Sequence, residues 1–159
     1  MKNRCAFPPL CLLILFFAPT TEPRAVASAN PTMQGCTLRV HADSLRNTRG
    51  VVGVLLFHSA SGWPENAAKA DRGESSPIAD GAHETTVTFR EVPPGDYGVV
   101  ALHDENKNMK LDRNMFGYPK EGFGFANNPH IGFGPPAFQA AIVHVACPET
   151  DTEIHIIYK

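Results

Sequence analysis

The sequence predicts an all-β domain with antiparallel pairing, folded as a sandwich or a partly open barrel. Three observations support this class. Short segments that alternate apolar and polar residues, or that are rich in β-branched and aromatic residues, recur along the chain. Turn-forming residues separate these segments, with 13 Gly and 14 Pro in the chain. No segment shows the sustained periodicity of a long amphipathic helix.

Four strands are expected in the first two thirds of the chain. Residues 36–42 alternate apolar and polar side chains, as in a half-buried strand, and residues 51–58 form an apolar run suited to a central strand. Residues 84–92 alternate again, and a tight Pro-Pro-Gly-Asp turn at 93–96 leads into the strand 97–103.

The remaining segments complete a set of six or seven strands. Residues 138–146 and 153–158 have strand composition. The polar stretch 59–83 is expected to be a connection, with one or two helical turns at 65–71. Residues 104–136 show little periodicity and are expected to form long loops.

Composition restricts the class of protein. The 159 residues are 43% hydrophobic and 19% charged, which suits one buried core and is too apolar for a disordered tail. The formal net charge is −2 and no basic block is present, so we expect no nucleic-acid binding. No apolar run reaches the roughly 18 residues of a membrane-spanning helix, so a helical channel or transporter is excluded.

The N-terminal segment has the features of a secretory signal peptide. Two basic residues precede an apolar core over residues 10–18, and A-x-A cleavage sites end at Ala27 and Ala29. We therefore expect a signal peptide over residues 1–29, cleaved after Ala27 or Ala29, and a periplasmic or secreted protein.

The four cysteines fall into two groups. Cys5 and Cys11 lie in the predicted signal peptide, whereas Cys36 and Cys147 lie near the two ends of a single domain over residues 30–159. Two cysteines in an oxidising compartment are expected to pair. The alternative, a redox-active pair, lacks the close C-x-x-C spacing.

Oxygen-bearing side chains recur in the segment that follows the strand 97–103. Asp104, Asn106, Asn108 and Asp112 occupy positions 1, 3, 5 and 9 of a loop in which Lys110 supplies a backbone carbonyl at position 7. This order matches the first nine positions of an EF-hand-type calcium loop, because Ca²⁺ takes six to eight oxygen ligands. The spacing predicts a Ca²⁺ site at these five residues.

Two positions depart from the calcium-loop pattern. Met109 stands at position 6, where the turn favours Gly, and Met115 stands at position 12, where a bidentate Glu is usual. Glu105 and Glu121 are the nearest additional carboxylates. We therefore expect micromolar to millimolar affinity. The alternatives are a Mg²⁺ site, or a solvated loop in which Asp and Asn form turns with their own backbone.

Glycine and aromatic residues dominate the segment 116–138. The aromatic rings either fold back onto a sheet or line a ligand groove. The candidate partner surface comprises Tyr118, Lys120, Glu121, Phe123 and Phe125. In a binding module for a small apolar or carbohydrate ligand, Trp63 and Phe133 would add exposed rings.

Zinc and hydrolase sites have weaker support in the sequence. The seven histidines show none of the usual zinc spacings, so a transition-metal site would have to assemble across strands, for example from His41, His144 and His155. No serine has the setting of a catalytic nucleophile, and His103 beside Asp104 is the nearest approach to a catalytic pair.

One set of motifs resembles a known family. The chain is similar to the bacterial exported family called domain of unknown function 2141 from about residue 37 to 159. The motifs are Pro94-Gly95-Asp96-Tyr97, Ala101-Leu102-His103-Asp104-Glu105-Asn106-Lys107-Asn108, Leu111-Asp112, and the G-x-P-K-E-G-F-G-F segment Gly117–Phe125. The resemblance implies a Greek-key-like sandwich of the transthyretin or immunoglobulin-like kind, also seen in collagen-adhesin B-type domains, with no assigned activity. A typical member reads N-G-K where this chain has Asn108-Met109-Lys110.

The leading hypothesis is an exported, non-catalytic, monomeric module. Its loop 104–112 binds calcium weakly and orders the adjacent glycine-aromatic loop, and its partner is an unidentified protein or small molecule. One alternative is a module that binds an apolar or carbohydrate ligand through the aromatic residues of 116–138. The other is a hydrolase-like enzyme on a transthyretin-type fold, which a pocket gathering His103, Lys120, Glu121 and a strand histidine would favour.

Overall fold

The protein was analysed as a computed structural model, which describes residues 35–159; the predicted signal peptide lies outside these residues. The described part contains eight strands and two short 3-10 helices. The strands are β1 (Cys36–Asp43), β2 (Val51–Phe57), β3 (Arg72–Pro77), β4 (Thr85–Val92), β5 (Gly95–Asp104), β6 (Gly122–Phe125), β7 (Ile142–Val145) and β8 (Glu149–His155); the helices are η1 (Ala67–Lys69) and η2 (Phe138–Ala141). No helix in this part of the chain is long and apolar enough to cross a bilayer.

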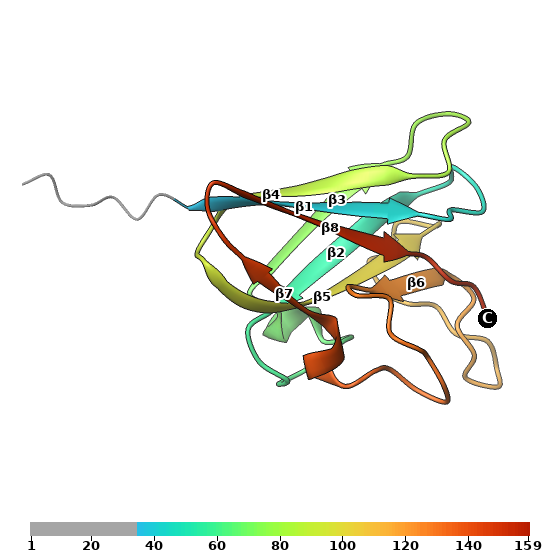
Figure 1. The fold of residues 1–159 in the computed structure, drawn as a ribbon. Helices are drawn as coiled ribbons and strands as arrows, with labels where there is room; N and C mark the ends of the chain where they lie inside the picture. Colours follow the sequence, from blue (N-terminus) through green and yellow to red (C-terminus); the bar gives the residue numbers. More distant parts are fainter. Residues whose placement is uncertain (1–34) are drawn as a thin grey trace, which may run out of the picture. The chain divides into compact units, whose positions relative to one another are not determined.

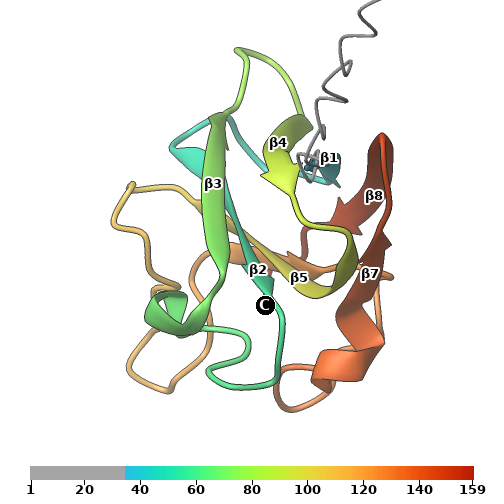
Figure 2. The same cartoon turned by 90° about the vertical axis from the view of Figure 1, so that its left-hand side faces the viewer.

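The strands form two sheets that pack face to face. One sheet has the order β4-β1-β8, and the other has the order β3-β2-β5-β6 with β7 also paired to β5 (Figures 1 and 2). The predicted all-β sandwich is confirmed. It differs from the expectation in having eight strands, and in the parallel pairing of β1 with β8, while the other strand pairs are antiparallel.

Alternation of side chains explains why these segments form a two-layer core. In β1 every second residue points inward, and Leu38 and Val40 are fully buried. Val52 and Val54 of β2 pack from the opposite sheet in the same core. Burial of such side chains stabilises the fold by about 1.5–3 kcal/mol each.

Strands β3 and β6 lie in segments that were expected to be loops. β3 has the polar sequence RGESSP and is an edge strand that pairs with the apolar β2. The segment forms a strand because it pairs with β2, and its own sequence does not have a strand pattern. β6 has the sequence GFGF, in which Gly122 and Gly124 permit close approach to the C-terminal segment. A Cβ at Gly122 would lie 2.4 Å from Tyr158, and one at Gly124 would lie 2.5 Å from Ile154.

Other elements differ from expectation in extent. The helical turn expected at 65–71 is the short η1, and the first four residues of the strand expected at 138–146 form η2 instead.

Cys36 and Cys147 form the predicted disulfide, with 111 residues of separation. This bond links the start of β1 to the segment between β7 and β8, and it is compatible with an extracytoplasmic location.

Candidate functional site

The candidate site begins where β5 ends, at Asp104. The Asp104 side chain folds back into the loop, where Oδ1 accepts a hydrogen bond from the Asn108 backbone N–H at 3.1 Å and Oδ2 accepts one from the Met109 N–H at 2.6 Å. Asp104 is only 2% exposed. Its carboxylate therefore organises the first six residues of the loop, 104–109, from inside.

The two asparagines connect the loop backbone to Asp112. Oδ1 of Asn106 accepts from the Asn108 N–H at 3.0 Å, and Oδ1 of Asn108 accepts from the Lys110 N–H at 2.8 Å. Their Nδ2 groups donate to the Asp112 carboxylate at 2.7 Å and 3.0 Å, respectively. The structure thus brings the side chains of Asp104, Asn106, Asn108 and Asp112 together in one loop.

Backbone conformation at Met109 follows the turn that a calcium loop requires. Met109 has φ of 60°, in the left-handed region that favours glycine, and Lys107 has φ of 61°. The Met109 side chain is 82% exposed. Methionine at position 6 therefore keeps the turn, with its side chain directed into solvent.

A third carboxylate closes the base of the loop. Glu121 is 4% exposed, and its Oε1 and Oε2 accept hydrogen bonds from the backbone N–H groups of Glu105 at 3.0 Å and Asp112 at 3.1 Å. Its place corrects its assignment to a partner surface, because a buried carboxylate cannot contact a partner directly. The G-x-P-K-E-G motif was the sequence signal for this residue, although spacing alone did not assign its role.

Glu105, the other nearby carboxylate, belongs to a different group. Arg46 Nε donates to Glu105 Oε1 at 2.6 Å, and Arg49 pairs with Oε2. Partial burial acts to raise the pKa of Glu105, but the two guanidinium groups outweigh it and lower that pKa. Glu105 is therefore a neutralised structural anion rather than a further ion ligand.

A buried hydrogen-bond chain fixes the end of β5 beneath the loop. His103 is fully buried, its Nε2–H donates to the Arg49 carbonyl at 2.8 Å, and its Nδ1 lies 2.6 Å from the Tyr158 hydroxyl. The Arg46 N–H donates to the same hydroxyl at 3.1 Å, so the tyrosine O–H donates to His103. Both ring nitrogens are thus hydrogen-bonded, and the imidazole links β5 to the Arg49 backbone and to the C-terminal segment.

A short hairpin extends from the loop. Asn114 N–H donates to the Tyr118 carbonyl at 2.8 Å, Arg113 pairs with Pro119, and Lys120 N–H donates to the Asp112 carbonyl at 2.8 Å. We call residues 113–119 the tip hairpin. Its exposed apolar side chains are Met115, Phe116 and Tyr118, at 91%, 79% and 59% exposure.

The predicted aromatic partner surface is divided by the structure. Tyr118 is exposed, but Phe125 is 3% exposed because its ring packs against Trp63, which also contacts Phe57 and Phe138. Assigning Phe125 to a partner surface is therefore wrong. Phe133 is fully exposed.

Of the three histidines considered for a transition-metal site, His144 lies in a different sheet from the other two. His144 on β7 pairs with Asp96 at 2.7 Å in the five-stranded sheet. His41 on β1 and His155 on β8 lie in the three-stranded sheet. Each of these imidazoles pairs with a different carboxylate.

Comparison with models of protein families gave a match. The model of a family described as an uncharacterized protein conserved in bacteria (DUF2141) matches residues 40–154. Neither the curated proteins nor the solved structures gave a match. The matched range runs from within β1 to within β8 and contains loop 104–112 and Glu121.

Proposed function

The chain belongs to the bacterial family DUF2141, and from that premise we propose that it is an exported, non-catalytic β-sandwich module whose loop 104–112 binds Ca²⁺ weakly. The proposed ligands are the side-chain oxygens of Asp104, Asn106, Asn108 and Asp112 and the carbonyl of Lys110. Glu121 adds a carboxylate at the base of the loop.

The observation that carries this proposal is a group of carboxylates with no cationic partner. Asp104, Asp112 and Glu121 lie in one loop and its base, and none of them forms a salt bridge with residues 35–159. Two of the three are buried. Charges that are removed from water are costly unless they are paired or coordinate a metal, so a divalent cation would relieve this arrangement.

The chemistry of the donors favours calcium over other cations. All proposed ligands are carboxylate, amide or carbonyl oxygens, which a hard cation prefers, and an irregular loop suits the flexible geometry of Ca²⁺ better than the strict octahedron of Mg²⁺. Only three carboxylates contribute, and the two Asn Nδ2 groups that now donate to Asp112 would have to give way. Weak affinity follows from both features.

Ion binding at this loop would act on the tip hairpin. Asp112 is the residue that joins the two, because its side chain accepts from the asparagines and its carbonyl accepts from Lys120. Restricting Asp112 would therefore restrict the hairpin that exposes Met115, Phe116 and Tyr118. We propose that this surface contacts the partner.

A calcium-dependent melting measurement tests the proposal. The test variant is Asp112→Asn, and the control is Asp80→Asn, an exposed aspartate outside the site. Melting temperatures are measured with chelator and with about 5 mM Ca²⁺, a concentration above the dissociation constants of extracellular calcium modules, about 0.1–1 mM. We expect Ca²⁺ to raise the melting temperature of wild type and the control, and to raise that of Asp112→Asn by much less. No shift and no heat of binding in wild type would refute the proposal.

A second candidate is a module that binds a small apolar or carbohydrate ligand. The specific observation in its favour is the exposure of aromatic rings at Phe116, Tyr118 and Phe133. Quenching or enhancement of tyrosine fluorescence by a ligand without added Ca²⁺, and its loss in Tyr118→Leu, would support this candidate over the calcium module.

A further inference from the structure

A second group of ligand-type side chains lies far from the calcium loop in sequence, on the outer face of the three-stranded sheet. Strands β1 and β8 pair in parallel there, with Asp43 opposite His155 and His41 opposite Glu153. Glu153 and His155 are two residues apart on β8, so their side chains project from the same face. The register thus places two carboxylates and an imidazole side by side, which sequence spacing alone did not indicate.

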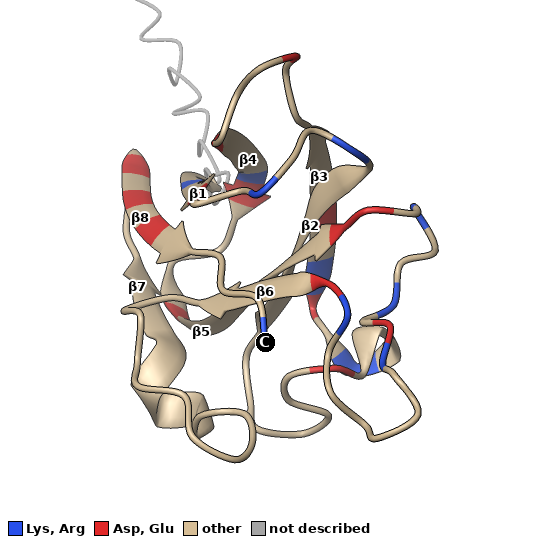
Figure 3. Cartoon of the chain, turned by 90° about the vertical axis from the view of Figure 1, so that its right-hand side faces the viewer, with Lys and Arg blue, Asp and Glu red and all other residues tan. Residues whose placement is uncertain are grey.

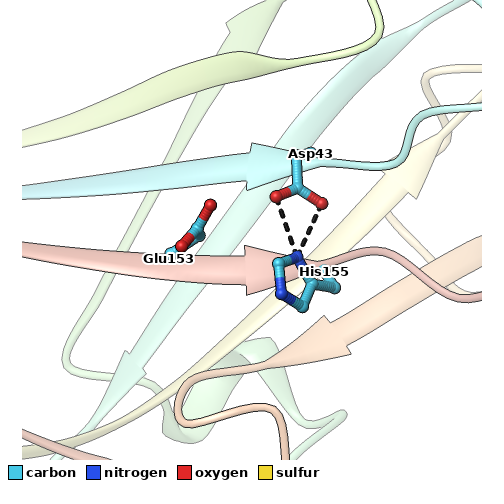
Figure 4. Close-up of side chains that lie close together, drawn as sticks. All are labelled: Asp43, Glu153 and His155. Carbon is cyan, nitrogen blue, oxygen red and sulfur yellow. Dashed lines mark hydrogen bonds and ion pairs between the residues drawn. The ribbon is translucent and has the colours of Figure 1, made fainter.

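The geometry of this group is close. His155 Nδ1 lies 2.7 Å from Asp43 Oδ1 and 2.8 Å from Oδ2 (Figure 4). Asp43, Glu153 and His155 each offer one ligand atom, and these three atoms lie within 4.8 Å of one another. Ligand atoms around a tetrahedral Zn²⁺ at bonds of 2.0–2.2 Å are separated by about 3.4 Å. Small side-chain rotations would therefore bring the three atoms to coordination distance.

We propose that Asp43, Glu153 and His155 form a binding site for a divalent transition-metal ion of the Zn²⁺ class. One imidazole and two carboxylates are ligands that zinc accepts, and the imidazole distinguishes this site from the all-oxygen calcium loop. The site is independent of the proposed function, because it shares no residue with loop 104–112.

The charge of the group favours a cation. Asp43 has His155 as a partner, but Glu153 forms no salt bridge with the described residues. With a neutral imidazole the group carries two negative charges. Figure 3 shows further acidic residues along β8, of which Glu149 and Asp151 pair with Arg39, so the unpaired negative charge of this strand lies at Glu153.

A second imidazole borders the same region. An open hollow of about 520 Å³ is lined by Asp43, Ser44, Ala82, His83, Glu84 and His155. His83 Nδ1–H donates to the Leu45 carbonyl at 2.8 Å, so its Nε2 can carry a lone pair for a metal. A carbonyl partner on the other ring nitrogen is the usual support of a ligating histidine. His83 borders the hollow but lies outside the group of ligand atoms within 4.8 Å of one another, so it would have to move to act as a fourth ligand.

Titration with Co²⁺ tests the site, because the visible absorption of Co²⁺ reports its coordination by nitrogen and oxygen ligands. Ca²⁺ binds an imidazole poorly, so this titration distinguishes the site from the calcium loop. The test variants are His155→Gln and Glu153→Gln. The matched control is His144→Gln, which removes the imidazole of another exposed His–Asp pair, on the other sheet. We expect one Co²⁺ per chain, displaced by Zn²⁺, in wild type and in the control.

Loss of a direct ligand should weaken Co²⁺ binding at least tenfold in both test variants, since even supporting residues contribute 10–100-fold. Melting in chelator verifies that each variant is folded. Undiminished binding by His155→Gln, equal losses in His155→Gln and His144→Gln, or no Co²⁺ spectrum in wild type would overturn the proposal. Asp112→Asn should bind Co²⁺ as wild type does, because Asp112 is not part of this group. Co²⁺ titration therefore tests the transition-metal site, and the calcium-dependent melting measurement tests loop 104–112 separately.

Discussion

Met109 adopts a backbone conformation that its side chain disfavours. At φ of 60° a residue with a Cβ atom is less stable than glycine by about 1–2 kcal/mol, and the greater chain entropy of glycine offsets part of that difference. The mostly exposed methionine side chain makes little compensating contact. Methionine instead of glycine at position 6 therefore lowers the free energy of unfolding but leaves the conformation of the turn unchanged.

We expect Met109→Gly to raise the free energy of unfolding by about 0.5–1 kcal/mol and to strengthen Ca²⁺ binding. Urea denaturation and calorimetry measure the two effects. Met115→Gly is the control, because Met115 is equally exposed but is not among the residues with positive φ. A loss of stability in Met109→Gly would show that the methionine side chain contributes an interaction of its own.

Tyr97 gives a pH dependence with a defined sign. Burial, together with the nearby Asp71 carboxylate, raises the pKa of Tyr97 above its ordinary value of 10.0, and its hydroxyl donates to the Pro93 carbonyl at 3.1 Å. Because the pKa of Tyr97 is higher in the folded state than in the unfolded state, the contribution of Tyr97 to the free energy of unfolding is complete below pH 10. This contribution declines as the pH rises through the folded-state pKa.

We therefore expect Tyr97→Phe to cost about 1 kcal/mol at pH 7, the usual value of one hydrogen bond, and progressively less above pH 10. Denaturant melts of both proteins from pH 7 to 11 measure the difference. A difference that stays constant over this range would contradict the assignment.

Among the elements, the buried Glu121 side chain holds the base of the loop from which the tip hairpin extends, and Arg113 and Asn114 add hydrogen bonds within the hairpin. Glu121 accepts hydrogen bonds from backbone groups on both sides of the loop, and each such bond to a charged group contributes about 1.5–3 kcal/mol. We expect Glu121→Ala to increase amide hydrogen exchange at least tenfold at Glu105 and Asp112 and through the tip hairpin.

The exchange experiment needs a carboxylate control. Glu84→Ala removes an exposed glutamate outside the loop, and its exchange pattern over 104–121 should equal that of wild type. Similar exchange in Glu121→Ala and wild type would show that the hairpin is held by other contacts.

Strands with a clear alternating pattern could be predicted, whereas strands formed by their neighbours could not. β1, β2, β4 and β5 contain alternating or continuous apolar residues, and their positions follow from that pattern. β3 is polar, and β6 owes its place to two glycines that fit against the C-terminal segment. Contacts between distant segments decide such elements, and a local pattern does not record them.

The candidate sites divide in the same way. The D-x-N-x-N spacing lies within one loop, so the four side chains could be placed together from the sequence. Glu121 is recruited from the next segment, and Asp43 meets His155 only because β1 and β8 pair in parallel with this register. Sites that assemble across strands require the topology to be known.

For the whole molecule, the disulfide is the main covalent constraint. It closes a loop of 111 residues, for which the chain-entropy model gives about 4–5 kcal/mol. We expect the Cys36→Ser, Cys147→Ser double variant to lose about this much free energy of unfolding, measured by urea denaturation against wild type. Retention of wild-type stability would show that the unfolded chain is not restricted by the bond.

The central position of β1 has a consequence for biogenesis. Its neighbours in the sheet are β4 and β8, and β8 is made only after more than one hundred further residues. During synthesis, β1 emerges early and waits without its parallel partner. Cys36 would likewise wait for its thiol partner. Assembly of the three-stranded sheet is therefore a late event, because its third strand is made last.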